Sequence, residues 1–277
     1  MIKFFIKSRE RLVTNYAFSK YLIVFFLVVS CVNSNETERQ IIDLTHTFSD
    51  ETVYWVTAKE FHLEEVANGD TDKGFFYAAN NFETAEHGGT HLDAPIHFSK
   101  GKLSVEEIPL EKLVGPAIKI DVSKEVSDNY DYLITIQNIL AWEKKNGQIP
   151  NESMVLLETG HSKHYPDKLK YLGTAQRGTD AIKLLHFPGL SPKAAQWLVD
   201  NRKINSIGID TPSIDYGQSE YFKSHVILLS ENIPIFENIA NLNKLPSKGF
   251  EVMALPMKIK DGSGAPLRII ALINKTL

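Results

Sequence analysis

The 277-residue chain has the composition of a globular protein, with 43% hydrophobic and 23% charged residues. Its hydrophobic content excludes a disordered chain, and its length allows one large domain or two small ones. Thirty basic residues against 34 acidic ones give a net charge of −4. This balance disfavours nucleic-acid binding, because there is no basic excess to neutralise phosphates. The single cysteine excludes a disulfide framework and a multi-cysteine zinc site, so a metal would have to be bound by His and carboxylate groups.

The first 30 residues have the pattern of an export signal. Five basic residues lie between positions 3 and 20, and an uncharged apolar run follows at 21–30. This run is too short to span a bilayer, which takes about 20 apolar residues. Cys31 follows directly in the sequence Leu-Val-Val-Ser-Cys, which resembles a bacterial lipobox.

We therefore expect a signal peptide over 1–30 and a lipidated N-terminus and linker over 31–40. The body over 41–277 would then be an exported, membrane-anchored lipoprotein in the periplasm or on the cell surface, touching the membrane only through the lipid on Cys31. Plain secretion and an uncleaved anchor are the alternatives.

The body of the chain predicts one mixed α/β domain, because strand-like and helix-like segments alternate and the helices are few for the length. Expected helices cover 136–145 and the residues that follow Ser191, which is an N-cap before Pro192. Two apolar runs, 227–229 and 233–236, are too short to assign. No phosphate loop or complete dinucleotide fingerprint is found in the sequence. We expect strands or extended segments at 41–44, 52–55, 115–122, 153–157, 204–209, 252–259 and 267–273.

A cluster of histidines between positions 86 and 98 carries the clearest chemical signal. His87, His91 and His97 lie with Asp93 inside eleven positions. These donors suit Zn²⁺ or Mn²⁺. The Gly-Gly pair at 88–89 disfavours a helix but allows the loop to fold back, so that His87, His91 and Asp93 converge on one ion. A polar loop with locally hydrogen-bonded histidines is the alternative, and it is disfavoured by four potential ligands in so short a segment.

The run HGGTHLDAPIH over 87–97 resembles the His-x-Gly-Thr-His-x-Asp-x-Pro-x-His signature of the metal-dependent cyclase family. That family includes bacterial arylformamidases, which are kynurenine formamidases, and isatin hydrolases. Segments 43–46, 187–191, 208–215 and 254–256 are also similar to family segments. The resemblance implies a swivelling β/β/α fold and a homodimer or larger homo-oligomer.

The resemblance further implies the residues of the site. The catalytic histidine would be His97, and Trp55 would contact the substrate. Without the resemblance, Trp55 would be assigned to the core. One or two divalent ions, Zn or Mn, would be bound, with Asp93 able to bridge them. The implied metal ligands are His87, His91, Asp93, His225 and Glu237. Taken alone, His225 could equally cap a strand and Glu237 could be a surface acid.

The remaining histidines and a group of polar residues near 210 have weaker assignments. Asp210, Ser213 and Asp215 follow a predicted strand, so they either support the site or form a turn. Four histidines fit no ligand spacing, and we expect them to contact solvent or to make local hydrogen bonds: His46, His161, His164 and His186.

These residues predict a hydrolase that cleaves a C–N bond with metal-activated water and His97 as the base. The substrate would be a small aryl formamide, as in tryptophan catabolism, or a cyclic amide such as isatin. A hydrolase of cyclic esters is an alternative within this mechanism. An exported metal-binding lipoprotein without catalysis is an alternative of another class. A two-lobed solute-binding receptor is disfavoured, because the sequence has no internal repeat.

Replacing Cys31 tests the lipid anchor. The variant Cys31→Ser lacks the thiol that would carry the lipid, so we expect the protein to leave the membrane fraction. Immunoblotting of membrane and soluble fractions measures this, with Ser34→Ala as the control in the same segment. A Cys31→Ser protein that partitions like the wild type would show that Cys31 is not a lipid attachment site.

Overall fold

The computed structural model describes residues 38–127 and 129–275, which fall in one compact unit. The predicted signal peptide and Cys31 lie outside the described residues. Strand β1 (Glu38–Asp43) begins inside the predicted linker of residues 31–40, so that prediction was wrong at its C-terminal end. Residues 38–40 pair in register with β12 (Gly264–Lys275), opposite Lys275, Asn274 and Ile273. Such pairing satisfies the backbone of a segment whose side chains are polar.

Eight strands form one mixed sheet in the order β1-β12-β11-β5-β7-β9-β10-β4, and β12 also pairs with β4. The last pairing closes the sheet on itself, as in a barrel. The neighbours from β5 through β7 and β9 to β10 are parallel, and the other pairings are antiparallel. The six strands not yet given bounds are β4 (His91–Asp93), β5 (Val114–Asp121), β7 (Met154–Glu158), β9 (Ser206–Ile209), β10 (Ile235–Glu237) and β11 (Lys248–Pro256).

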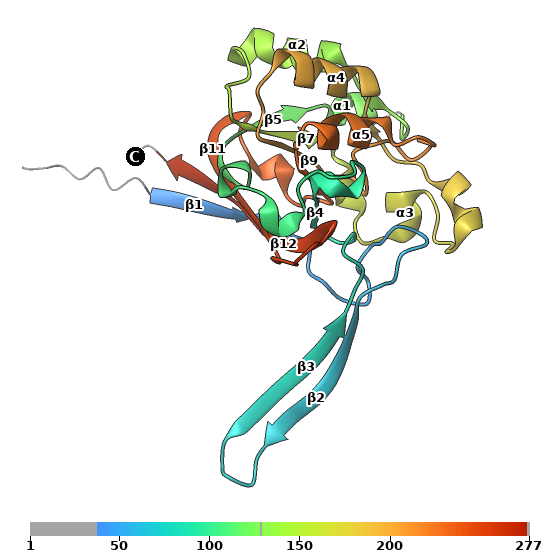
Figure 1. The fold of residues 1–277 in the computed structure, drawn as a ribbon, viewed down its shortest axis with the longest axis vertical. Coiled ribbons are helices and arrows are strands. Elements are labelled where there is room, and N and C mark those ends of the chain that lie inside the picture. The colour runs from blue at the N-terminus through green and yellow to red at the C-terminus, as the bar shows by residue number, and fades with distance from the viewer. Residues whose placement is uncertain (1–37, 128, 276–277) are drawn as a thin grey trace, which may run out of the picture. The chain divides into compact units, whose positions relative to one another are not determined.

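The central strands are buried on both faces, which explains why their sequences are continuous apolar runs. In β7, Val155 and Leu157 pack toward the helices, while Met154 and Leu156 point into the interior of the closed sheet. Figure 1 shows α2 (Ile136–Asn146) and α4 (Pro192–Asn201) on one side of the central strands β5, β7 and β9. The prediction of one mixed α/β domain with more sheet than a doubly wound fold is confirmed.

Both predicted helices are present, and the predicted cap at Ser191 is confirmed. Thr135 accepts a hydrogen bond from the backbone of Asn138 at the start of α2, and Ser191 accepts one from Ala194 at the start of α4. The short apolar runs at 227–229 and 233–236 become parts of α5 (Lys223–Ser230) and β10. The other short elements are α1 (Ser123–Val126), α3 (Lys168–Leu172), the β6 (Leu133–Ile134) and β8 (Gly189–Leu190) pair, and the 3₁₀ turns Pro95–His97, Val105–Glu107, Leu110–Lys112, His161–His164, Thr179–Leu184 and Leu242–Lys244.

Residues 52–55, expected as a strand or extended segment, form no strand, and Tyr54 makes a single bridge with Gly88. A long hairpin of β2 (His62–Asp70) and β3 (Phe76–Glu83) was not predicted. It projects from the body as a separate two-stranded sheet (Figure 1). Its strands are largely exposed, so they lack the alternation of a half-buried strand. Among the described residues, no helix is long and apolar enough to cross a membrane.

Shortening a side chain inside the closed sheet should destabilise the fold. Leu156 is fully buried, so Leu156→Ala removes apolar contacts and leaves a cavity. We expect a loss of about 2–5 kcal/mol in the free energy of unfolding. The control Leu140→Ala changes an exposed side chain on α2 and should cost no more than about 0.5 kcal/mol. Denaturant titration measures both, and equal effects would contradict the assignment of Leu156 to the core.

Candidate metal centre

The register of β4 with β10 brings the first three site residues together. His91 lies directly opposite Glu237, and Asp93 is two positions further along the same strand. Side chains at alternate positions share a face of a sheet, so these three point the same way. Leu92 and Phe236, on the opposite face, are fully buried in the interior of the closed sheet. The alternation of polar and apolar residues therefore places three candidate metal-ligand side chains on the face that α5 covers.

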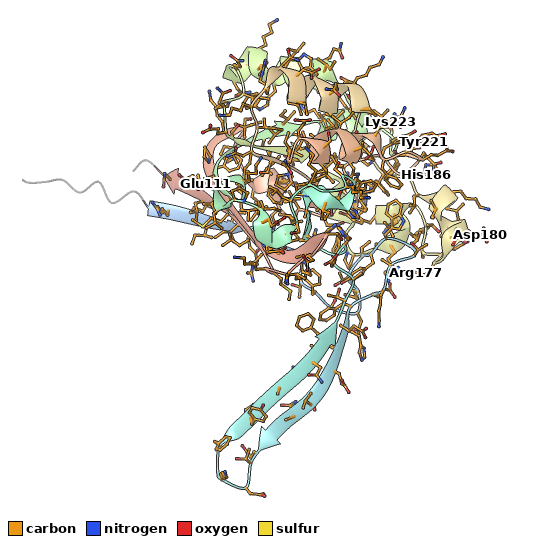
Figure 2. All side chains as sticks on the ribbon, viewed as in Figure 1. Glu111, Arg177, Asp180, His186, Tyr221 and Lys223 are labelled. Carbon is orange, nitrogen blue, oxygen red and sulfur yellow. The ribbon has the colours of Figure 1, made fainter. Side chains whose placement is uncertain are left out.

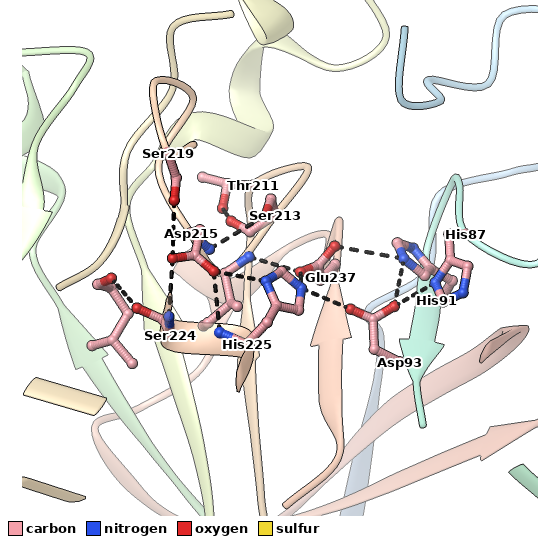
Figure 3. A network of polar contacts seen from close by, with 12 residues as sticks. His87, His91, Asp93, Thr211, Ser213, Asp215, Ser219, Ser224, His225 and Glu237 are labelled. Carbon is pink, nitrogen blue, oxygen red and sulfur yellow. Dashed lines mark hydrogen bonds and ion pairs between the residues drawn. The ribbon is translucent and has the colours of Figure 1, made fainter. Parts of the chain in front are cut away.

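His225 reaches the same point from the first turn of α5. Its Nε2 atom lies 3.1 Å from Asp93 Oδ2 and 3.1 Å from Glu237 Oε1. The Nε2 atom of His91 lies 3.1 Å from Asp93 Oδ1 and 3.5 Å from Glu237 Oε2. All four side chains are buried. Figure 3 shows them converging around the two carboxylates, although more than a hundred residues separate the two halves of the cluster.

His87 joins the cluster from the loop before β4. Its Nδ1 atom lies 2.6 Å from Asp93 Oδ1. Its Nε2 atom lies 3.0 Å from the hydroxyl of Ser263, which donates a hydrogen bond to Glu86. The glycine after His87 is needed at this point, because a Cβ atom on Gly88 would lie 2.0 Å from the ring of Tyr54. Because Gly88 has no side chain, the loop backbone can lie directly against the ring of Tyr54.

His97 lies beside the cluster in the 3₁₀ turn Pro95–His97. Its ring stacks on that of His87 with centroids 3.8 Å apart. Burial lowers the pKa of His97 to about 4, despite the opposing charge of Asp93, so the ring is neutral at pH 7. Its donor nitrogen also falls within 4.8 Å of donor atoms of His87 and Asp93. This position suits either a base or a ligand, and the catalytic role of His97 stays a prediction.

The donor set fits a divalent cation. Two groups of potential ligands share Asp93: one contains His87 and His97, and the other contains His91 and Glu237. Histidine nitrogen and carboxylate oxygen are the donors that Zn²⁺ and Mn²⁺ accept in proteins. Within residues 38–127 and 129–275, no Lys or Arg side chain pairs with Asp93 or Glu237. Their buried negative charge is therefore left to the histidines or to a bound cation.

The pKa values of Asp93, Glu237 and His91 are shifted by burial and by the charges of their neighbours. Burial favours the neutral form of Asp93, but His87 and His91 outweigh it and hold the pKa of Asp93 well below its usual range. Burial and the neighbouring Asp93 raise the pKa of Glu237. Burial opposes protonation of His91, but the two carboxylates outweigh it and raise the pKa of His91 to about 8. Protons and a metal ion would compete for the same nitrogen and oxygen atoms.

Outer contacts fix the orientation of two of the histidines. Asp215 Oδ2 lies 2.7 Å from Nδ1 of His225 and also accepts the backbone N–H of His225. The carbonyl of Gly89 lies 3.0 Å from Nδ1 of His91 and accepts the amide of Asn238. Each Nδ1 atom is thereby engaged, which leaves Nε2 directed at the carboxylates. The supporting role considered for Asp215 is the one its contacts favour over a turn role.

Asp210 and Ser213 do not hold a histidine of the cluster in the way that Asp215 holds His225. Asp210 is fully buried and accepts hydrogen bonds from the backbone and hydroxyl of Thr159, away from the ligand cluster. Ser213 lines the cavity beside Glu237. The backbone N–H of Ile214, next in the chain, donates to Glu237 Oε1 at 2.7 Å. The turn after β9 therefore holds Glu237 through its backbone rather than through the side chains considered from the sequence.

A cavity of about 310 Å³ opens above the cluster. Its floor holds the ligand side chains and its walls are aromatic. Trp55 and Phe222 meet edge-on with ring centroids 5.9 Å apart, and Phe222 lies 5.4 Å from Phe98. Trp55 therefore lines the cavity and is not part of the central core. The aromatic walls added by Phe98 and Phe222 were missed, because neither residue belongs to a sequence motif.

The four histidines that fit no ligand spacing make local contacts outside the cluster. His46 stacks on Tyr165, and its Nε2 atom has no hydrogen-bond partner among the described residues. The expectation of a hydrogen bond or solvent contact therefore fails at that atom. His161 is buried and lies 2.7 Å from the carbonyl of Tyr171. His186 pairs with Asp131 at the surface. His164 is part of a group of aromatic rings beside His161.

Removing the carboxylate behind His225 should weaken metal binding. The variant Asp215→Asn keeps the shape of the side chain but loses the charge that orients His225. We expect about 10–100-fold weaker binding of Mn²⁺ and Zn²⁺, measured by competition with a chelator. The control Asp131→Asn changes an exposed carboxylate–histidine pair and should leave the affinity unchanged. His91→Ala, which removes a predicted ligand, should lose more. Equal affinities in all variants would contradict a metal at this site.

The chain is similar in sequence and in fold to known metal-dependent hydrolases. Residues 42–216 match the model of the Cyclase family. The chain is 32% identical to isatin hydrolase of Roseibium aggregatum, over 90% of this chain and 92% of that protein. It is 30% identical to kynurenine formamidase of Bacillus cereus, over 66% of this chain and 75% of that protein. Among solved structures, isatin hydrolase A from Labrenzia aggregata bound to benzyl benzoate superimposes with a TM-score of 0.78 at 33% identity, covering 86% of this chain and 94% of the other. The fold, the ligand cluster and these matches together show that the chain belongs to the Cyclase family.

Proposed function

We propose that the protein is a metal-dependent hydrolase that opens the C–N bond of a small aromatic cyclic amide of the isatin type. The observation that carries the proposal is the position of Asp93. Its two oxygen atoms contact three histidines on the floor of an aromatic-walled cavity. A carboxylate contacted on both oxygens can bridge two cations, so one or two ions fit the donor set.

His87, His91, Asp93, His225 and Glu237 would hold the metal, which is Zn²⁺ or Mn²⁺ by the chemistry of these donors. A divalent ion bound there supplies a Lewis acid that polarises the substrate carbonyl and makes water acidic enough to react near neutral pH. The chain supplies the geometry. Asp215 and the carbonyl of Gly89 fix the two histidine rings, and burial of the carboxylates excludes water from around the ligands.

His97 would move the proton. Because burial keeps its ring neutral, it can accept a proton from the attacking water as the new C–O bond forms. It then returns that proton to the nitrogen as the C–N bond breaks. The water oxygen thus ends in a carboxylic acid, which releases the second water proton to solvent and becomes a carboxylate, and the ring nitrogen ends as an amine. This sequence needs no nucleophilic side chain.

The walls of the cavity favour an aromatic substrate. Trp55, Phe98 and Phe222 offer ring faces and edges to a flat molecule. The longer match, to isatin hydrolase, supports a cyclic amide over the aryl formamide that the name kynurenine formamidase indicates. A cyclic ester would follow the same steps and is the second candidate, because aromatic walls would select the ring of a substrate and not the atom at its scissile bond.

The contrasting alternative, an exported lipoprotein that binds metal without catalysis, is disfavoured by the matches to two hydrolases, isatin hydrolase and kynurenine formamidase. It shares the ligand cluster and the predicted lipid on Cys31, but it has no use for a neutral histidine stacked beside the ligands. The activity of His97 variants separates these two proposals.

Replacing His97 by Asn should remove the proton transfer and retain the metal. The amide fills a similar space but does not relay a proton at neutral pH. We expect kcat to fall by about 10²–10⁴-fold with little change in bound Mn or Zn. Turnover of isatin, formyl-anilides and simple lactones, with metal content measured on the same preparation, tests this. The control is His186→Asn, a surface histidine outside the cavity.

The outcomes are distinct. If His97→Asn loses metal in proportion to activity, His97 is a ligand and the base lies elsewhere. If it retains near-full turnover with metal bound, another group carries the proton. If the wild-type protein binds metal and hydrolyses no member of the panel, the proposed amide hydrolysis is wrong.

A further inference from the structure

One wall of the cavity is built by a turn and not by a strand or helix. Residues 53–58 belong to no regular element, yet Val53, Tyr54, Trp55 and Ala58 all line the cavity. The N–H of Ala58 donates to the carbonyl of Trp55 at 2.9 Å and closes the turn. One backbone hydrogen bond of its own does not fix such a segment on the body of a protein, so other contacts must hold this wall.

Arg177 supplies such contacts from the loop after α3. Its Nη1 atom donates to the carbonyl of Trp55 at 3.2 Å, and its Nη2 atom donates to the carbonyl of Ala58. One planar group thus bridges both ends of the turn, which suits the fixed fork of donors on arginine. The N–H of Gly178 adds a hydrogen bond to the carbonyl of Val56 at 2.9 Å. Figure 2 shows Arg177 beside the chain that leads into the β2–β3 hairpin.

A carboxylate holds the guanidinium group in this position. Glu60 Oε1 lies 3.5 Å from Nη1 of Arg177 and 2.6 Å from Nζ of Lys168, the first residue of α3. The side chain of Arg177 is 35% exposed, so most of its surface is covered by its neighbours. Partly exposed ion pairs contribute little stability, whereas hydrogen bonds from a charged donor to two carbonyls fix a geometry. The main effect of Arg177 is therefore to place the turn.

Arg177 is separate from the residues that would carry the chemistry. It does not line the cavity, and its polar contacts within the described part of the chain are with the turn and Glu60. Strand pairing and Asp215 hold the candidate ligands instead. Any effect of Arg177 on a substrate must therefore pass through the turn. Within the turn, Trp55 has the largest side chain, and its ring contacts that of Phe222 in the cavity wall.

We propose that Arg177 is a positioning residue for the substrate. By bridging the carbonyls of Trp55 and Ala58, it holds the ring of Trp55 where a flat aromatic molecule enters the cavity. This inference rests on the proposed function, because it takes the substrate to be aromatic. A contact made equally in the ground state and the transition state affects KM and leaves kcat unchanged. The role assigned to Arg177 is therefore in binding and not in the chemical step.

Steady-state kinetics with isatin test the effect on the substrate. Arg177→Gln removes the bridge, and we expect KM to rise by about 3–10-fold, the range of one aromatic contact, with kcat and bound metal unchanged. In a Trp55→Ala background the same substitution should add little, because the ring it positions is gone. The matched control is Arg268→Gln, which removes a surface arginine paired with Asp43 and should leave KM unchanged.

A signal from Trp55 itself tests the geometry without turnover. The chain has three tryptophans, so protein labelled with fluorotryptophan should give three fluorine NMR resonances. Trp55→Phe identifies the resonance of Trp55. Arg177→Gln should shift or broaden this resonance and leave the other two in place, and Arg268→Gln should move none. If Arg177→Gln does not fold, Arg177→Lys serves in both experiments, because it retains the charge without the planar fork and should give smaller changes in the same direction.

The two measurements separate the ways in which the inference can fail. A Trp55 resonance that the Arg177 variants leave unchanged would overturn it. A rise in KM that is equally large in the Trp55→Ala background would also overturn it, because Arg177 would then act through another residue. So would a fall in kcat or bound metal in a folded Arg177 variant. If the wild-type protein hydrolyses no member of the substrate panel, the proposed function is wrong, and the resonance alone then decides whether Arg177 positions Trp55.

Discussion

The site depends on a three-residue strand held between two partners. Strand β4 pairs with β10 on one side and with β12 on the other, and these two pairings close the sheet. The backbone of His91 and Asp93 is therefore held by strand pairing on both sides, whether or not a metal is bound. Because the pairing partner of His91 is Glu237, one antiparallel register sets the relation between the ligand motif and a carboxylate 146 positions away in the chain. A shift of β4 by one residue would turn His91 and Asp93 into the interior of the closed sheet and away from Glu237.

Because this cluster is buried, its charged side chains would cost free energy if they were left unpaired. Two carboxylates with little access to water lie within contact of three imidazoles, and their protonation states are linked. Buried charges are tolerated when they are paired and hydrogen-bonded, and here the pairing is supplied by histidines whose far nitrogens are themselves bonded. Asp215 is the strongest example, because it holds both the ring and the backbone of His225. The fold thus prepares a set of Nε2 and carboxylate oxygen atoms that point at a common volume.

The sequence predicts those parts of the molecule whose patterns are local. The parallel strands β7 and β9 appear as apolar runs and β5 as an alternating segment, and the cap at Ser191 marks the start of a helix. His87, His91 and Asp93 are visible as a cluster because they lie within seven positions. His225 and Glu237 carry no local signal, since strand pairing and a helix start bring them in, and only the family resemblance indicates them. The β2–β3 hairpin has no buried face, so its strands lack the periodicity on which strand prediction depends.

Tyr54 connects two regions that have been described separately. Its ring lies against Gly88, next to the first histidine of the ligand loop, and its hydroxyl shares a hydrogen bond with Thr84, the residue that follows β3. A single rigid side chain thus spans from the base of the projecting hairpin to the ligand loop. Its conformational freedom is low, because it is almost fully buried and has no room to change rotamer. Whatever holds the hairpin in place therefore also limits the thermal motion of His87, and the precision of the ligand geometry is set partly from outside the cavity.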